Sequence, residues 1–179
     1  MKYIRTYIKS LAGSFIGLAM LLFFQNNAVA QAHVSDKNYD MLLSTLLVHD
    51  VPEVEVNDAK TEENVIWLDA REKAEYNVSH IRGAIWVGYD DFSRQRIAAL
   101  DKNATYIVYC SVGYRSEQIT DSLMQAGFIH VQNLYGGIFE WVNTGNPVVD
   151  TNGMQTNKVH AYSKSWGIWL KRGEKVYDN

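Results

Sequence analysis

The sequence has a single cysteine, two prolines and no Lys/Arg-rich run after residue 30. One cysteine cannot form an internal disulfide, so the chain lacks the cross-links that many exported proteins use. The low proline count and the 47% hydrophobic content exclude the disordered and Pro-rich classes. A chain of 179 residues with this composition fits one compact domain that buries its own core.

The first 30 residues differ from the rest of the chain. They combine a basic start, an uncharged and mostly apolar run over residues 11–24, and the small-residue cleavage pattern Ala28-Val29-Ala30. This succession is typical of a secretory signal peptide. A retained membrane anchor is the alternative, but the run is shorter than the roughly 20 residues that span a bilayer as a helix. We therefore expect residues 1–30 to be a signal peptide and the mature protein to be periplasmic or secreted, with no stable membrane association.

The charge balance bears on the expected partners. Three of the 17 basic residues and none of the 20 acidic ones lie in residues 1–30, so residues 31–179 hold 14 basic and 20 acidic side chains. Binding of nucleic acid needs basic patches that displace counterions from phosphates, and we expect no such partner. We also expect no metal site, because a lone cysteine and five scattered histidines show no ligand spacing.

Apolar periodicity divides the chain after residue 30 into alternating helices and strands. A helical pattern runs from Lys37 to Val48, and a second amphipathic helix is expected over Phe92–Leu100. The unbroken apolar run Val65–Leu68 and the β-branched and aromatic run Thr105–Tyr109 are typical of buried parallel strands. This alternation predicts an α/β fold with a mostly parallel central sheet and helices on both faces.

The C-terminal residues 148–179 show no clean period. They contain Trp166 and Trp169 among serines and other polar residues. Since aromatic side chains dominate cores as well as interfaces, we expect this tail to pack on the domain.

Cys110 follows the expected strand 105–109 and precedes a loop and a helix, for which Ser116 is the expected N-cap. Ligands of open parallel sheets bind outside the carboxyl ends of the strands, and the unpaired N–H groups of a helix N-terminus attract anions. A thiolate at this position is such an anion, and Arg115 adds a nearby cation. On these grounds alone, Cys110 is either a nucleophile or a small buried hydrophobe, and Arg115 either serves the thiolate or forms an ordinary salt bridge.

Three segments together resemble the rhodanese family. Residues 109–116, YCSVGYRS, look like its active-site loop. Residues 69–84, which contain Asp69-Ala70-Arg71, Glu75-Tyr76 and HIRGA, are similar to its other signature, and LYGGI at 134–138 with Trp141 resembles its closing segment. The segments match in order and spacing over roughly residues 36–145, so a rhodanese-like domain is expected at residues 31–147.

The resemblance implies a thiosulfate sulfurtransferase-like enzyme. Such an enzyme takes sulfur from a small donor, carries it as a persulfide on the cysteine and passes it to a thiophilic acceptor, with no cofactor besides that covalent intermediate. The expected catalytic residues are Cys110 and Arg115, and the expected substrate-binding cradle comprises Ser111, Val112, Gly113 and Tyr114. The expected supporting network, in which Arg71 and Glu75 have the spacing of a helical pair, comprises Asp69, Arg71, Glu75 and His80.

Two other functions remain open at this point. Cysteine-dependent phosphatases and arsenate reductases also hold a thiolate in an anion-binding loop, but they resemble one another in having five residues between cysteine and arginine. Here there are four. The second alternative is a catalytically idle module that docks another exported protein through the aromatic tail, against which the intact cysteine loop argues.

The signal-peptide interpretation predicts where the mature chain begins. N-terminal sequencing of protein recovered from the periplasm or the culture medium is expected to give Gln31, or a residue next to it, as the first residue. Recovery of a chain that begins at Met1 from the membrane fraction would instead establish a retained anchor.

Overall fold

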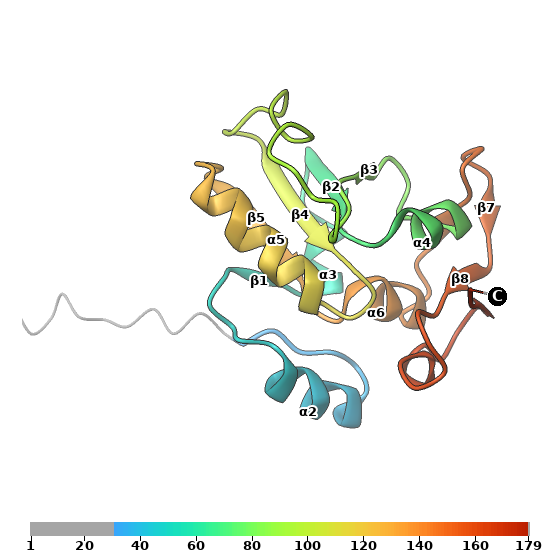
Figure 1. The fold of residues 1–179 in the computed structure, drawn as a ribbon. Helices are drawn as coiled ribbons and strands as arrows, with labels where there is room; N and C mark the ends of the chain where they lie inside the picture. Colours follow the sequence, from blue (N-terminus) through green and yellow to red (C-terminus); the bar gives the residue numbers. More distant parts are fainter. Residues whose placement is uncertain (1–30, 179) are drawn as a thin grey trace, which may run out of the picture. The chain divides into compact units, whose positions relative to one another are not determined.

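The computed structural model describes residues 31–178, so the expected signal peptide lies outside the described residues. Within this range no helix is long and apolar enough to cross a bilayer. Five strands form the central sheet, and each hydrogen-bonded pair is parallel. In spatial order they are β1 (Glu53–Val54), β5 (His130–Leu134), β4 (Thr105–Tyr109), β2 (Val65–Asp69) and β3 (Ile85–Trp86) (Figure 1). The prediction of a mostly parallel central sheet is confirmed.

Helices and short turns connect the strands of this sheet. The longest is α5, the 12-residue helix that follows the Cys110 loop. The helices are α2 (Lys37–Leu46), α3 (Val56–Ala59), α4 (Lys73–Val78), α5 (Tyr114–Gln125) and α6 (Gly137–Asn143).

The central strand β4 separates two hydrophobic cores. Tyr106 and Val108 belong to the core that includes buried side chains of α5. Ile107 and Tyr109 alternate with them and belong to the other core, which includes buried side chains of α2, α3 and α6. Because successive side chains of a strand point to opposite faces, helices cover both faces of the sheet (Figure 1).

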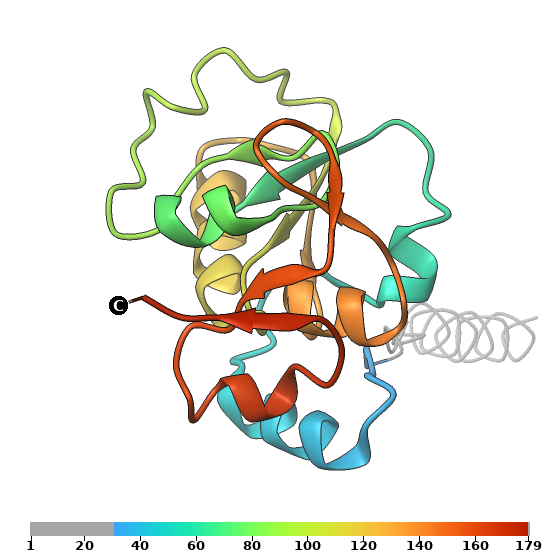
Figure 2. The same cartoon turned by 90° about the vertical axis from the view of Figure 1, so that its right-hand side faces the viewer.

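The C-terminal segment packs against this domain. It contains β6 (Val148–Val149), β7 (Gln155–Thr156), β8 (Lys158–His160), the 3-10 turn η1 (Gly167–Trp169) and β9 (Glu174–Val176). Trp169 stacks on Tyr39 of α2 with ring centroids 5.4 Å apart, and Trp166 packs against the same core. Figure 2 shows η1 beside α2, although the two are far apart in sequence.

The prediction of a helix over Phe92–Leu100 is wrong. Residues 92–100 form a series of turns closed by hydrogen bonds between residues three apart, such as Ala98 N–H to the Gln95 carbonyl. Ile97 is fully buried there, whereas Phe92 and Leu100 are only partly buried. A single well-buried anchor does not supply the tertiary packing that holds a short helix in water.

The predicted N-cap of α5 is also wrong. The helix begins at Tyr114, and Gly113 caps it with a φ of 116°, a conformation that glycine adopts without a steric penalty. Ser116 lies inside the first turn, where its hydroxyl is 3.0 Å from the Gly113 carbonyl and 2.7 Å from Oδ1 of Asn133. The serine therefore anchors the helix to β5.

Candidate functional site

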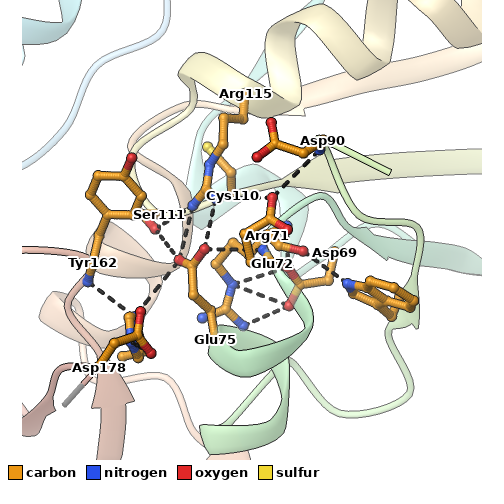
Figure 3. Close-up of polar contacts among 12 residues, drawn as sticks. Asp69, Arg71, Glu72, Glu75, Asp90, Cys110, Ser111, Arg115, Tyr162 and Asp178 are labelled. Atoms are coloured by element: carbon orange, nitrogen blue, oxygen red, sulfur yellow. Dashed lines mark hydrogen bonds and ion pairs between the residues drawn. The ribbon is translucent and has the colours of Figure 1, made fainter. Parts of the chain in front are cut away.

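Cys110 lies directly after β4, at the carboxyl end of the sheet, and its loop leads into α5 (Figure 3). The side chain is only 1% exposed. The N–H of Gly113 donates to Sγ at 3.2 Å. The N–H groups in the first turn of α5 follow at once, and such groups have no acceptor within their own helix. The Gly113 N–H is thus a backbone donor directed at the sulfur atom.

The other side of this loop is held by α6. Ile138 N–H donates to the Cys110 carbonyl at 2.9 Å, and Phe139 N–H donates to the Ser111 carbonyl at 3.1 Å. A Cβ atom on Gly137 would lie 2.5 Å from the Cys110 carbonyl oxygen, so only glycine permits this approach. Because the Cys110 and Ser111 carbonyls point toward α6, the Gly113 N–H is left on the side of the loop that faces the sulfur atom.

A buried ion pair ties the loop to α4. The Arg115 guanidinium donates to both carboxylate oxygens of Glu75, at 2.6 and 2.9 Å, and the Ser111 hydroxyl donates to the same carboxylate at 3.0 Å (Figure 3). Burial by itself would raise the pKa of Glu75, but the hydrogen bonds and charge of Arg115, together with the charge of Arg71 and the Glu72 N–H, hold the pKa below its ordinary value. The carboxylate is therefore charged at neutral pH and offsets the arginine.

Asp69 and Arg71 form a second buried pair. Arg71 Nη2 donates to Oδ2 of Asp69 at 2.6 Å and to the Ser79 carbonyl at 2.7 Å. The predicted pairing of Arg71 with Glu75 is wrong, because Arg71 precedes α4 and its guanidinium binds the end of β2. Ser79, which follows α4, has an extended backbone with a φ of −169°, which any residue adopts.

His160 approaches the Glu75 carboxylate, whereas His80 contacts Tyr76. His80 stacks on Tyr76 at 3.9 Å between ring centroids, and its Nδ1 is 3.0 Å from the Tyr76 carbonyl. His160 of β8, which sequence reasoning did not select, is buried with Nδ1 4.0 Å from Glu75 Oε1. Its Nδ1 also accepts from the N–H of Tyr162 at 3.2 Å.

A cavity of about 330 Å³ opens over Cys110. The predicted loop residues Ser111, Val112, Tyr114 and Arg115 line it, whereas Asp69, Arg71, Glu75 and His80 are outside its lining. Sequence reasoning did not place the remaining lining residues at the site: Leu46, Glu72, Tyr89, Asp90, Tyr162 and Trp166. No local pattern marks them, because they come from α2, from two loops and from the C-terminal segment.

The described histidines have carboxylates or backbone groups as neighbours. His33 is 2.9 Å from Asp40, and His49 is 3.1 Å from Glu53. Among residues 31–178, no group of three or more His, Cys, Asp or Glu side chains is arranged to hold a metal ion.

The arrangement suits chemistry at sulfur. Cys110 belongs to the lining of the cavity, and a backbone N–H directed at a cysteine sulfur favours negative charge there. The Arg115–Glu75 ion pair ties the loop to α4.

Comparisons with known proteins bear on this site. A sequence model described as the rhodanese-like domain matches residues 53–144. A tRNA uridine(34) hydroxylase of Hamiltonella defensa is 35% identical over 127 residues, which are 68% of this chain and 34% of that protein. The thiosulfate sulfurtransferase PspE of Escherichia coli is 38% identical over 72 residues, 39% of this chain and 68% of that protein.

Solved structures agree with the sequence matches. The solution structure of a rhodanese-like domain from Anabaena sp. superimposes with a TM-score of 0.52 at 29% identity and covers 55% of this chain and 79% of that one. The chain spans about a third of the length of the first of its curated relatives, the H. defensa hydroxylase.

The close approach of α6 to the loop predicts a strong effect of Gly137→Ala. The added methyl group would meet the backbone of Cys110 and Ser111 at 2.5–2.7 Å, and the φ of 56° adds strain. We expect a loss of about 2–4 kcal/mol in the free energy of unfolding, from overpacking and backbone strain together. Denaturant titration followed by fluorescence measures it.

Gly83→Ala is the matched control. Gly83 has a similar positive φ of 77°, but no atom lies within 4 Å of the position of its added Cβ. Gly83→Ala therefore introduces the backbone strain without the steric clash. We expect a smaller loss in the free energy of unfolding, about 1–2 kcal/mol. Equal losses in the two variants would show that α6 does not constrain the Cys110 loop.

Proposed function

The chain belongs to the rhodanese-like domain family, and on that premise we propose that it is a sulfurtransferase that carries sulfane sulfur as a persulfide on Cys110. One observation carries the proposal: Sγ of Cys110 accepts the Gly113 N–H inside a loop that opens on a cavity. A similarity to a protein named thiosulfate sulfurtransferase supports it.

The reaction balances without an external oxidant. The Cys110 thiolate attacks the outer sulfur of a donor such as thiosulfate, the donor S–S bond breaks, and sulfite leaves with the electron pair. A thiophilic acceptor, such as cyanide or a second thiolate, then attacks the outer sulfur of the persulfide. The bond within the persulfide breaks, and Cys110 becomes a thiolate again.

The side chains near Cys110 have different roles in this proposal. Cys110 is the nucleophile, and the backbone N–H groups from Gly113 onward stabilise the thiolate and the terminal sulfur of the persulfide. Arg115 and Glu75 are positioning residues that hold the loop through Ser111. Asp69 and Arg71 fix the end of β2 beside it.

The geometry disfavours phosphoryl transfer. The oxygens of a phosphoryl group need donors on several sides and a cation to offset their charge. Here Arg115 is bound to Glu75, and two further carboxylates, Glu72 and Asp90, line the cavity. An anionic phosphate ester would meet net negative charge.

Hydroxylation of tRNA is less well supported. The hydroxylase relative is about three times as long as the part that matches, and residues 31–179 are net acidic, which opposes binding to phosphates. Nor does the geometry favour an idle binding module, because Cys110 lies within the cavity lining. We further propose that sulfur transfer takes place outside the cytoplasm, on the strength of the signal-peptide pattern in residues 1–30.

Persulfide formation on Cys110 is the direct test. After incubation with excess thiosulfate, intact-protein mass spectrometry is expected to show the gain of one sulfur atom, and cyanide should remove it. Cys110→Ser should abolish the gain, because it removes the nucleophile while changing the volume of a buried side chain little. Circular dichroism should show that this variant remains folded.

Hydrolysis of an aryl phosphate should be assayed in parallel on both proteins. Cys110-dependent phosphatase activity in a protein that never gains sulfur would refute the sulfurtransferase proposal.

A further inference from the structure

The cavity over Cys110 is lined by apolar side chains in one part and by charged side chains in another. One part of the lining is apolar or aromatic and includes Leu46, Val112, Tyr162 and Trp166. Leu46, Tyr162 and Trp166 lie outside residues 53–144, the part that the family model matches. The C-terminal segment and α2 therefore add an apolar wall to a loop that belongs to the part matched by the family model.

The charged part of the lining is acidic in balance. Glu72, Asp90 and Arg115 are its charged members among the described residues. Arg115 is already bound to both oxygens of Glu75, and Glu72 is 3.9 Å from the same guanidinium. One cation thus stands against three carboxylates, so the charged side chains around the cavity are net negative and disfavour a dianion more strongly than a monoanion.

Any donor must place its leaving group in this cavity. Cys110 is buried on its other sides by the loop and the hydrophobic core, so a donor approaches from the open side. In-line displacement at sulfur then directs the leaving group away from Sγ, between the apolar wall and the carboxylates. The chemistry of this space selects the leaving group.

We propose, building on the sulfurtransferase function, that this cavity selects sulfane-sulfur donors with an apolar, singly charged or uncharged leaving group over the thiosulfate dianion. Tyr162 and Trp166 bind the apolar body, and Asp90 with Glu72 repels the second negative charge. An organic thiosulfonate is a suitable probe. The Cys110 thiolate attacks its outer sulfur, the S–S bond breaks, and a sulfinate leaves with the electron pair.

The backbone at Tyr162 is consistent with a fixed wall. Its φ is 61°, which is rare for a bulky side chain, and its ring lies 5.1 Å from the Arg115 guanidinium carbon. Its N–H donates to the buried His160. The hydrogen bond fixes the Tyr162 backbone, and the contact with Arg115 places its half-exposed ring at the cavity.

Three donors separate charge from apolar size. Thiosulfate and methanethiosulfonate have similar size but differ by one negative charge. Methanethiosulfonate and benzenethiosulfonate have the same charge but differ in apolar body. The measured quantity is kcat/KM for sulfur transfer to cyanide, expressed as the two ratios between neighbouring donors, so that differences in intrinsic reactivity cancel between variants.

Asp90→Asn should change only the ratio of kcat/KM for methanethiosulfonate to kcat/KM for thiosulfate, which reports on charge. We expect the preference for methanethiosulfonate over thiosulfate to fall about fivefold, the effect of one unit-charge interaction a few ångströms apart in water. Asp50→Asn is the control, because Asp50 is exposed and outside the cavity lining, and it should leave the ratio unchanged.

Trp166→Leu should change only the ratio of kcat/KM for benzenethiosulfonate to kcat/KM for methanethiosulfonate, which reports on the size of the apolar body. The preference for the phenyl over the methyl donor should fall about tenfold, since a pocket that loses part of its apolar wall discriminates less. Tyr162→Asn is a second variant in case the first does not fold, because asparagine tolerates a positive φ. Ile168→Ala, in the same segment but outside the lining, is the control and should leave the ratio unchanged.

The outcomes separate this inference from the function on which it rests. If none of the three donors loads sulfur onto Cys110, the sulfurtransferase function itself fails. If all load it but both ratios stay the same in Asp90→Asn and in the wall variants, the function stands and the proposed donor selection is wrong.

Discussion

The bidentate ion pair between Arg115 and Glu75 is the interaction on which the rest of the site depends. Its side chains are only 12% and 2% exposed, so each charge relies on the other for the solvation it has lost. Removal of one partner from such a buried pair typically costs about 3–5 kcal/mol, because the remaining charge is left uncompensated. The pair joins α4 to the first turn of α5, and the same carboxylate accepts from Ser111, so it links α4 to both ends of the loop after Cys110.

This use of Arg115 limits what the arginine can do for sulfur. Because its charge is largely offset by Glu75, we propose that a thiolate or persulfide at Cys110 is stabilised mainly by backbone N–H groups such as that of Gly113. The loop is suited to that role because α6 takes up its carbonyls at Cys110 and Ser111. A backbone N–H donor at the sulfur suits a small, singly charged sulfur atom, whereas the acidic side chains of the cavity lining act against larger anions.

Sequence reasoning predicted the parts of the molecule that local patterns determine. The apolar run at residues 65–68 and the β-branched and aromatic run at 105–109 identified the central strands, and the YCSVGYRS segment identified the loop and its cysteine. It assigned the wrong partner to Arg71, because i, i+4 spacing applies only inside a helix and α4 begins two residues later. The prediction of a helix over residues 92–100 was wrong because Phe92 and Leu100 are only partly buried, which leaves Ile97 as the one well-buried side chain of that apolar face.

The walls of the cavity were not predictable in the same way. Tyr162 and Trp166 reach the site only because β8, η1 and β9 fold back on the domain, and nothing in their own segment has a helical or strand period. His160 likewise approaches Glu75 through tertiary packing alone. Such residues require the fold before they can be assigned to the site.

We propose that the loop backbone, rather than the charge of Arg115, stabilises anionic sulfur. The most direct measurement is the rate of Cys110 alkylation as a function of pH in the native protein, in Arg115→Met and in Arg115→Met/Glu75→Gln, each checked for native folding. We predict that Arg115→Met moves the half-maximal rate to higher pH, since it leaves the Glu75 carboxylate unpaired near the sulfur. The double variant should return close to the native curve. A double variant displaced as far as Arg115→Met would contradict the account and assign the stabilisation to the arginine itself.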